Sequence, residues 1–313
     1  MTAITILALS LFAVIQAAAF ATKYSEKVAE SFRLSRYVVG FVVVSFISIL
    51  PETLIAINAA LQGEPSLGIG TIFGSNVADL TIIFAILVFI AGRRGVRVEK
   101  GLMKKLAIYP LFLTIPLLLG VDGHYSREEG MVLIIVGIIF YYSVFRKSVG
   151  VSSRDPSITQ QRLRNILLLV ASMALLLVAS YYTAESAVDL AHYLNVKPVL
   201  VGVLIISLGT TIPELFFSAK AIRNKKDSMA VGDILGSVLA DATIVVGIVA
   251  IISPFYFPQI IAYIAGGFMV ISSMILINYM RTRLRVVRRE AILLIIIYIV
   301  YIACELIANA STS

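Results

Sequence analysis

The sequence predicts an all-α polytopic membrane protein in which ten transmembrane helices form two inverted repeats of five helices. Three observations lead to this fold class: the composition, the number of long apolar runs, and one motif that occurs twice. Hydrophobic residues make up 59% of the 313 residues and charged residues only 14%, whereas a soluble domain carries about 25% charged residues. The net charge of +8 is therefore better explained by membrane topology than by a nucleic-acid partner, which we do not expect.

The apolar runs are about 20 residues long, which is the length that crosses the hydrocarbon core of a bilayer as a helix. We predict ten spans, near residues 2–22, 36–61, 66–92, 103–120, 128–145, 163–184, 196–219, 228–252, 257–279 and 288–309. The first half of the chain, residues 1–150, then holds a repeat at about 36–92. The second half, residues 151–313, holds the matching repeat at about 196–252.

The basic residues alternate strictly between the two sides of these spans. Of the 26 Lys and Arg residues, 24 fall in five connections on one side, namely 23–36, 93–105, 146–164, 220–226 and 281–289. The positive-inside rule places that side in the cytoplasm. Both termini are then extracytoplasmic, in a multi-pass protein of the plasma or inner membrane. Each half has an odd number of spans, so the two halves have opposite orientations.

The first span has small residues at positions 17–21, as a cleaved signal peptide would. No basic residue precedes its apolar run, however, and its removal would break the symmetry of the two halves. We therefore expect the first span to be retained.

One motif occurs twice at a constant spacing. A shift of 162 residues superposes Pro51-Glu52 on Pro213-Glu214 without a gap. The same shift superposes Gly74-Ser75-Asn76-Val77-Ala78-Asp79 on Gly236-Ser237-Val238-Leu239-Ala240-Asp241, and it also pairs Gly40 with Gly202, Ser45 with Ser207 and Gly70 with Gly232. Matched carboxylates in two membrane-embedded halves are typical of a cation site at a repeat interface.

Pro51 and Pro213 explain how backbone oxygens join these carboxylates. Proline has no N–H and clashes with the carbonyl four residues earlier, so carbonyl groups one turn before Glu52 and Glu214 are expected to be released from the helix ladder. Carbonyl and carboxylate oxygens are the ligands that Ca²⁺ prefers. A structural ion pair is the alternative for the glutamates, but no Lys or Arg lies deep within any predicted span.

The two aspartates belong to a Gly-Ser-x-x-x-Asp pattern. Ser75 and Asp79 are four residues apart and share a helix face, as do Ser237 and Asp241. The functional interpretation is that these side chains line flanking cation sites. The alternative is that the serines only fill space and the aspartates are protonated hydrogen-bond donors.

These motifs resemble the Ca²⁺/cation antiporter superfamily, and within it the membrane region of prokaryotic-type sodium/calcium exchangers. The second half carries the resemblance best, with Ser207-Leu208-Gly209-Thr210-Thr211-Ile212-Pro213-Glu214 followed by the stretch from Gly232 to Asp241. The resemblance covers essentially the whole chain. It implies a secondary active antiporter that exchanges Ca²⁺ for Na⁺ or H⁺ by alternating access, with no resident cofactor and no enzymatic activity.

The resemblance also implies roles for individual residues. Glu52 and Glu214 would bind Ca²⁺ together with the carbonyl groups of Ser48 and Thr210. Monovalent-cation or proton sites beside the Ca²⁺ would be lined by Ser75, Ser237, Asp79 and Asp241, with a hydroxyl from Thr211 and carbonyl groups from Ser45 and Ser207. The protein is expected to work as a monomer in the lipid bilayer.

The chain departs from the family pattern at several positions. Ile47 and Ile49 replace the Gly and the hydroxyl residue of the first motif, and Thr71 and Asp233 each replace an Asn. Asp79 occupies a position that is often Asn. One monovalent site is thus expected to lack an oxygen, which argues against the usual coupling of three Na⁺ to one Ca²⁺.

Two functions from other classes stay open at this point. A passive cation channel would also need carboxylates, but channels usually build their pore by oligomeric symmetry. An intramembrane aspartyl protease would use Asp79 and Asp241 as a dyad, but it has no need of matched glutamates behind prolines. The one cysteine, Cys304, excludes an internal disulfide.

Overall fold

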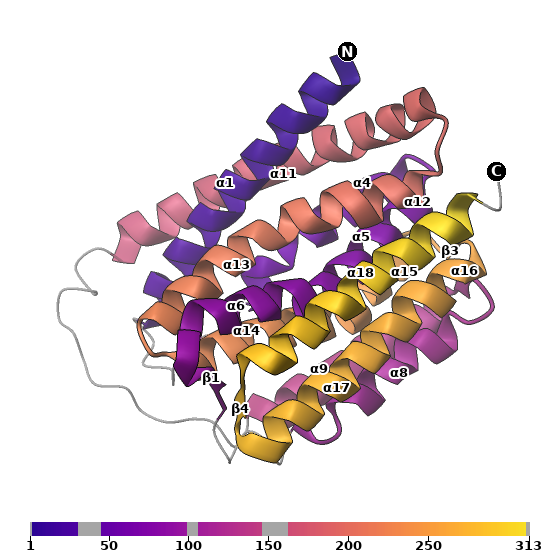
Figure 1. The fold of residues 1–313 in the computed structure, drawn as a ribbon. Coiled ribbons are helices and arrows are strands. Elements are labelled where there is room, and N and C mark those ends of the chain that lie inside the picture. The colour runs from indigo at the N-terminus through magenta and orange to yellow at the C-terminus, as the bar shows by residue number, and fades with distance from the viewer. Residues whose placement is uncertain (1, 31–44, 99–105, 146–161, 311–313) are drawn as a thin grey trace.

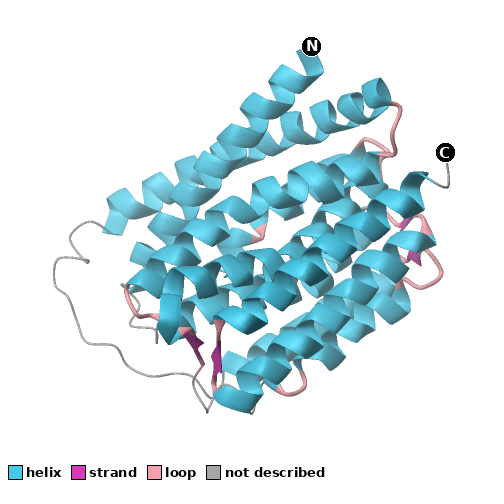
Figure 2. Ribbon diagram, viewed as in Figure 1, coloured by secondary structure: helices cyan, strands magenta, loops and turns pink. Residues whose placement is uncertain are grey.

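The computed structural model describes residues 2–30, 45–98, 106–145 and 162–310. These residues form a bundle of long helices that run side by side, as Figure 1 shows. Short pairs of strands lie at the two ends of the bundle, and the rest of the described chain is helix or connecting turn (Figure 2). The protein is therefore mostly helical, as the sequence predicts.

The helices follow the order of the predicted spans. The α-helices are α1 Thr2–Glu30, α3 Ser45–Ser48, α4 Leu50–Leu61, α5 Pro65–Ala78, α6 Phe84–Ala91, α8 Tyr109–Leu119, α9 Arg127–Phe145, α11 Arg162–Leu194, α12 Pro198–Val201, α13 Ser207–Arg223, α14 Asp227–Ala240, α15 Val246–Ile252, α16 Gln259–Ile261, α17 Gly267–Arg283 and α18 Arg288–Ala310. Wider π-helical segments continue four of them without a break: η2 Asp79–Ile83, η4 Gly202–Ile206, η5 Asp241–Val245 and η6 Ala262–Gly266. A 3₁₀ turn, η3 Gly92–Arg94, follows α6.

Seven helices among the described residues are long and apolar enough to cross a membrane. They are Ile4–Ser25, Pro65–Arg94, Arg162–Leu194, Pro198–Arg223, Asp227–Ile252, Gln259–Arg283 and Arg288–Ala308. Shorter apolar helices occupy Phe46–Leu61 and Tyr109–Leu119. The predicted starts of these two, near residues 36 and 103, lie outside the described residues. Helix α8 begins at Tyr109 with Pro110 in its first turn, a position where the missing N–H costs nothing.

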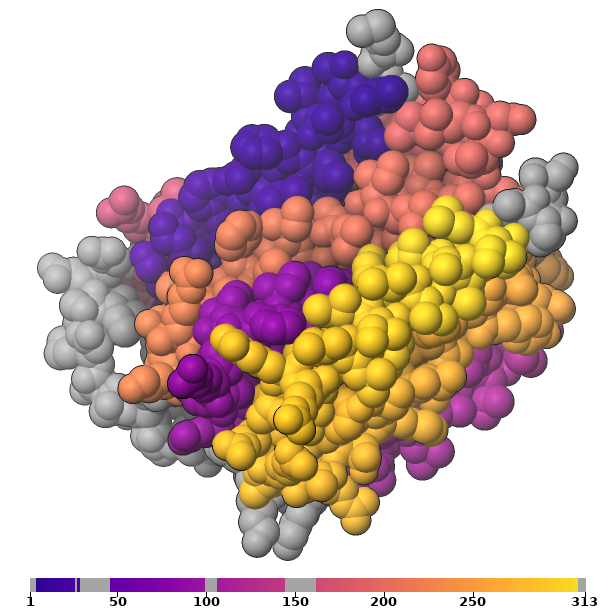
Figure 3. Space-filling model, in the orientation of Figure 1, coloured from indigo at the N-terminus to yellow at the C-terminus, as the bar shows by residue number. Residues whose placement is uncertain are grey.

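The outer surface is apolar, as a lipid-facing surface must be. Large hydrophobic side chains are exposed along α11 and α18, including Leu163, Leu167, Val170, Ile299 and Ile307. Figure 3 shows α18, in yellow, on the outside of the bundle. A soluble protein rarely exposes continuous apolar surface of this extent, so the exposed face agrees with a multi-pass membrane protein.

Two strand pairs identify the two ends of the bundle. Strand β1 (Val96–Arg97) pairs with β4 (Arg285–Val286), and β2 (His124–Tyr125) pairs with β3 (Phe255–Tyr256). The β1–β4 end, which we call the basic end, thus joins two of the Arg- and Lys-rich connections. An ion pair of 2.6 Å between Arg94 and Asp227 adds a third connection to this end. The first residues of α1 and the last residues of α18 lie toward the opposite end (Figure 1).

The two sequence halves contact each other in a reciprocal way. Helix α5 of the first half packs against η4 and α13 of the second, and α14 of the second half packs against α3 of the first. Under the shift of 162 residues these contacts are images of each other. Helices α1 and α11, which are also images of each other, lie side by side (Figure 1). The packing is thus consistent with a two-fold relation between halves.

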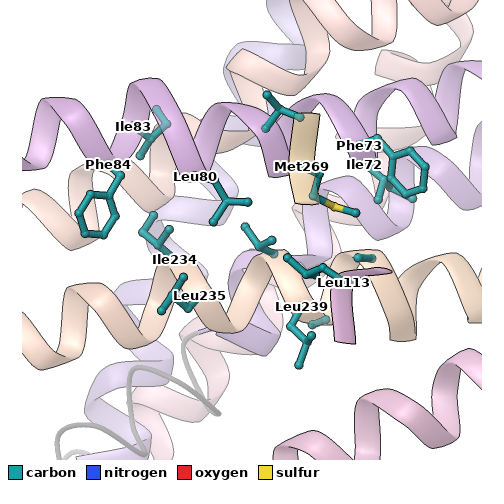
Figure 4. Packing of buried hydrophobic residues seen from close by; sticks show 14 of the residues in the cluster. Ile72, Phe73, Leu80, Ile83, Phe84, Leu113, Ile234, Leu235, Leu239 and Met269 are labelled. Atoms are coloured by element: carbon teal, nitrogen blue, oxygen red, sulfur yellow. The ribbon is translucent and has the colours of Figure 1, made fainter. Parts of the chain in front are cut away.

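The hydrophobic core that surrounds the site lies between η2, α14 and α17. Figure 4 shows Leu80, Ile234 and Met269 in the space between these helices. All three side chains are fully buried. This dry packing holds the two motif-bearing segments at fixed positions, because close-packed interiors resist displacement.

Close contact between the halves depends on glycine. A methyl group built on Gly202 would lie 2.5 Å from the carbonyl oxygen of Leu67 and 3.0 Å from the amide nitrogen of Thr71. Neither backbone atom can move away cheaply. A methyl group on Gly267 would meet nothing within 4 Å.

We therefore expect Gly202→Ala to destabilise the protein by about 1–3 kcal/mol, the usual cost of overpacking. Gly267→Ala is the matched control, and there the better helix propensity of alanine is expected to leave stability unchanged or slightly raised. Thermal unfolding of both variants in detergent measures the difference. Equal melting temperatures would mean that the interface between halves is not tightly packed.

Candidate functional site

The proline-glutamate motifs have different local structures in the two halves. The helix breaks at Ile49 between α3 and α4, so Glu52 lies in the first turn of α4. Free N–H groups and the helix dipole favour a negative charge there. In the second half, α13 continues through Pro213, and Glu214 lies in the helix interior. The sequence predicts released carbonyl groups before the proline in both halves. The structure has a helix break at this place only in the first half.

Both glutamates are buried. Glu52 is 1% exposed and Glu214 is 2% exposed. Ser237 Oγ, from α14, donates to Glu214 Oε2 in α13 at 3.2 Å. This contact connects the two motif segments of the second half.

The two aspartates each begin a π-helical segment. Asp79 opens η2 and Asp241 opens η5, at positions related by the same shift of 162 residues. Both are 1% exposed. π-helical turns are rare and are frequently found at functional sites.

Several carboxylate oxygens of the site have no hydrogen-bond donor among the described residues. They are Oε2 of Glu52, Oδ1 of Asp79 and Oδ1 of Asp241. A buried acceptor without a donor is costly. These oxygens are therefore suited to ligate a cation.

The hydroxyl groups of the motifs donate to the carbonyls of their own helices. Ser75 Oγ donates to Ile72 O at 2.9 Å, Thr211 Oγ1 donates to Leu208 O at 3.0 Å, and Ser207 Oγ donates to Val203 O. Thr210 donates to the carbonyls of Ile206 and Ser207, each at 3.1 Å. Because a hydroxyl has two lone pairs besides its hydrogen, these bonds leave the oxygens able to accept a cation.

The side chains of two residues in the predicted motifs are not described. Gly40 lies outside the described residues, and of Ser45 only the backbone is described, as the first residue of α3.

Asp233 is a buried carboxylate that the sequence did not assign to the site. It is fully buried, and its oxygens accept hydrogen bonds from Ser48 Oγ at 3.3 Å and Ser218 Oγ at 3.0 Å. Ser48 was expected to act through its carbonyl, and its hydroxyl has this additional partner. One feature of the sequence could have identified Asp233 as a site residue: it stands where the family pattern has Asn.

Asn76 is a second such side chain. It lies in α5 and is fully buried, with its amide nitrogen 3.5 Å from Met269 Sδ in α17. Its carbonyl oxygen has no donor among the described residues. It belongs to the first copy of the motif, and Val238 stands at the matched position.

The site thus gathers five buried carboxylates: Glu52, Asp79, Glu214, Asp233 and Asp241. Electrostatic interactions link Glu214 to the other four. No Lys or Arg is buried among the described residues. Within the same residues no three acidic, His or Cys side chains come close enough to form a metal centre by themselves. Hydroxyl and carbonyl oxygens would therefore have to complete the coordination of a hard cation.

The profile of the family described as sodium/calcium exchanger protein matches residues 2–146 and 164–306 of the chain. An uncharacterized membrane protein of Methanocaldococcus jannaschii is 27% identical over 218 residues, which are 69% of this chain and 71% of that protein. A sodium/calcium exchanger of Methanosarcina acetivorans is 21% identical over 340 residues, covering 95% of this chain and 96% of the exchanger.

A solved structure has the same fold. The sodium-calcium exchanger NCX_Mj, in a crystal soaked with Na⁺, superposes on the chain with a TM-score of 0.73 at 23% sequence identity. The match covers 96% of this chain and 98% of NCX_Mj.

Proposed function

Because the chain belongs to the sodium/calcium exchanger protein family, we propose that it is a secondary active antiporter that exchanges Ca²⁺ for Na⁺ or H⁺ by alternating access. The observation that supports this most is the pair of matched glutamates, Glu52 and Glu214, buried without a buried Lys or Arg among the described residues. A charge at membrane depth costs at least about 2.5–3.5 kcal/mol. A transported cation offsets that cost whenever it is bound.

In this proposal Glu52 and Glu214 bind Ca²⁺ with the carbonyls of Ser48 and Thr210. The flanking sites for Na⁺ or H⁺ are lined by Ser75, Ser237, Asp79 and Asp241, with Thr211 adding a hydroxyl and Ser45 and Ser207 adding carbonyls. Because Na⁺ or H⁺ and Ca²⁺ depend on the same carboxylates, they compete, and competition for one site is the basis of exchange.

The proposed architecture has ten spans in two inverted halves, residues 1–150 and 151–313. The boundary between them lies outside the described residues. The basic end is cytoplasmic by the positive-inside rule, so both termini are extracytoplasmic. Related proteins include an inner membrane protein of Escherichia coli, 25% identical over 238 residues, which supports a location in the cell membrane. One chain contains both halves of the site, so the monomer is the functional unit.

The matched glutamates and the burial of the site favour this function over the two alternatives. A protease dyad of Asp79 and Asp241 would leave the buried Glu52 and Glu214 without a role. A channel would need a continuous pore, and here the carboxylates are 1–2% exposed. A closed site of this kind suits alternating access.

Replacement of either glutamate by glutamine tests the Ca²⁺ site. Glu52→Gln and Glu214→Gln should each reduce Ca²⁺ uptake into vesicles to background, because each removes a charged ligand from a site with no spare one. Glu128→Gln, at an exposed position in α9, is the control and should transport like the wild type. Normal uptake by either buried-site variant would refute the assignment of these ligands.

The energy source is tested with purified protein in liposomes. Ca²⁺ flux should require an opposing gradient of Na⁺ or H⁺. When Ca²⁺ leaves, the buried carboxylates are costly without a cation, so Na⁺ or H⁺ must take its place. Flux is measured after each gradient is imposed alone. Ca²⁺ movement that needs neither gradient would favour the channel.

Ile49 provides a test of the coupling ratio. It stands opposite Thr211 under the repeat, so the first half lacks a hydroxyl that the second half has. We expect fewer Na⁺ ions per Ca²⁺ than in relatives with an intact motif, and stronger inhibition by acid. The reversal condition for Ca²⁺ flux, with Na⁺ and pH gradients clamped separately, gives the ratio. Ile49→Ser should raise the Na⁺ dependence, and a ratio of three in the wild type without any pH effect would contradict the prediction.

A further inference from the structure

We propose that Asp233, together with the hydroxyl groups of Ser48 and Ser218, forms an additional binding position for Ca²⁺ between the basic end and the four matched carboxylates. The inference rests on the proposed exchange function and deepens it. It gives the transported cation a stopping point on one side of the centre only.

The ligands come from three helices of both sequence halves. Ser48 lies in α3, Ser218 in α13 and Asp233 in α14. Both carboxylate oxygens of Asp233 are engaged, one by each serine, at 3.3 and 3.0 Å. One carboxylate and two hydroxyl groups are hard oxygen donors of the type that Ca²⁺ accepts. The serine hydrogens can turn away when a cation arrives, because hydroxyl groups rotate freely.

The three side chains are displaced from the centre in the same direction. Ser218 follows Glu214 by four residues within α13, so its hydroxyl lies about 6 Å along that helix from the glutamate. Ser48 precedes Glu52 by four residues, across the helix break at Ile49. Asp233 precedes Asp241 by eight residues, about 12 Å along α14. Helix α13 runs toward the basic end, and α14 begins there at Asp227. All three displacements therefore point to the basic end.

A small pocket lies at the basic end, at the connection between α13 and α14. It has a volume of about 80 Å³ and is lined by Phe217, Lys220, Ala221, Asn224, Lys226 and Met229. Asp233 does not line this pocket, but it follows Met229 by one helical turn of α14. The two lysines of the pocket repel a cation that approaches from this end. In this proposal the negative charge of Asp233 opposes that repulsion.

The repeat lacks a carboxylate that matches Asp233 and a hydroxyl that matches Ser218. Thr71 stands opposite Asp233 and Ala56 opposite Ser218 under the shift of 162 residues. The Thr71 hydroxyl donates to the carbonyl of Leu67 in its own helix at 2.9 Å. The access path from the β2–β3 end therefore has no carboxylate at the corresponding place. This asymmetry makes two roles of Asp233 distinguishable. A role in cation access should affect transport from the basic end only, whereas a role in holding the helices together should affect transport from both ends.

The test is side-specific transport. Asp233→Asn keeps the size of the side chain and its ability to bond both serines, but removes the charge. We measure the Ca²⁺ concentration for half-maximal flux in vesicles of defined orientation, first with Ca²⁺ at the basic end and then with Ca²⁺ at the other. The value at the basic end should rise about fivefold or more, as expected for the loss of a partly desolvated opposite charge. The value at the other end should change by less than about twofold.

Two further variants make the result specific. Thr71→Val is the matched control from the first half and should change neither value. Ser218→Ala removes a hydroxyl but keeps the charge, so it should shift the basic-end value in the same direction by a smaller factor. It also keeps the test valid if Asp233→Asn yields no folded protein on size exclusion.

The outcomes distinguish this inference from the proposed function. The inference fails, and the proposed function stands, if an active Asp233→Asn or Ser218→Ala variant shows no change in the half-maximal Ca²⁺ concentration at either end. It fails in the same way if this concentration changes equally at both ends. A wild-type protein without any cation-coupled Ca²⁺ flux would overturn the proposed function and this inference with it.

Discussion

Five buried carboxylates without a buried Lys or Arg among the described residues determine how the rest of this structure is built. Hydrogen bonds from serine side chains reduce the cost of burying them, but cannot remove the charge. The apolar core around Met269 and the close contacts at Gly202 hold the carboxylates together in spite of their mutual repulsion. Apolar packing thus stabilises an arrangement of carboxylates that attracts cations.

Much of this arrangement could be predicted from the sequence, because helix length and basic connections are properties of the chain alone. The grouping of three basic connections at one end is visible in the β1–β4 pair and the Arg94–Asp227 ion pair. The break before Pro51 was also predictable from the chemistry of proline. The continuous helix through Pro213 was not, since tertiary packing can hold a helix together across a proline.

The π-helical segments and the role of Asp233 could not have been read from the sequence. The segments at Asp79 and Asp241 are local widenings of a helix, and no residue type encodes them as glycine encodes a turn. Asp233 receives one of its two hydrogen bonds from a serine 185 residues earlier. Such a contact depends on how α3 packs against α14, whereas spacing rules reach only along one helix.

The duplication is most informative where its copies differ. Two identical inverted halves would give the inward-open and outward-open states equal energies and equal affinities. Here the first half loses an oxygen at Ile49, while the second half gains two at Asp233 and Ser218. A cation shifts the balance between two states only through its different affinity for each. In the proposed antiporter, the unmatched oxygens are thus the part of the site that makes the two sides of the membrane unequal.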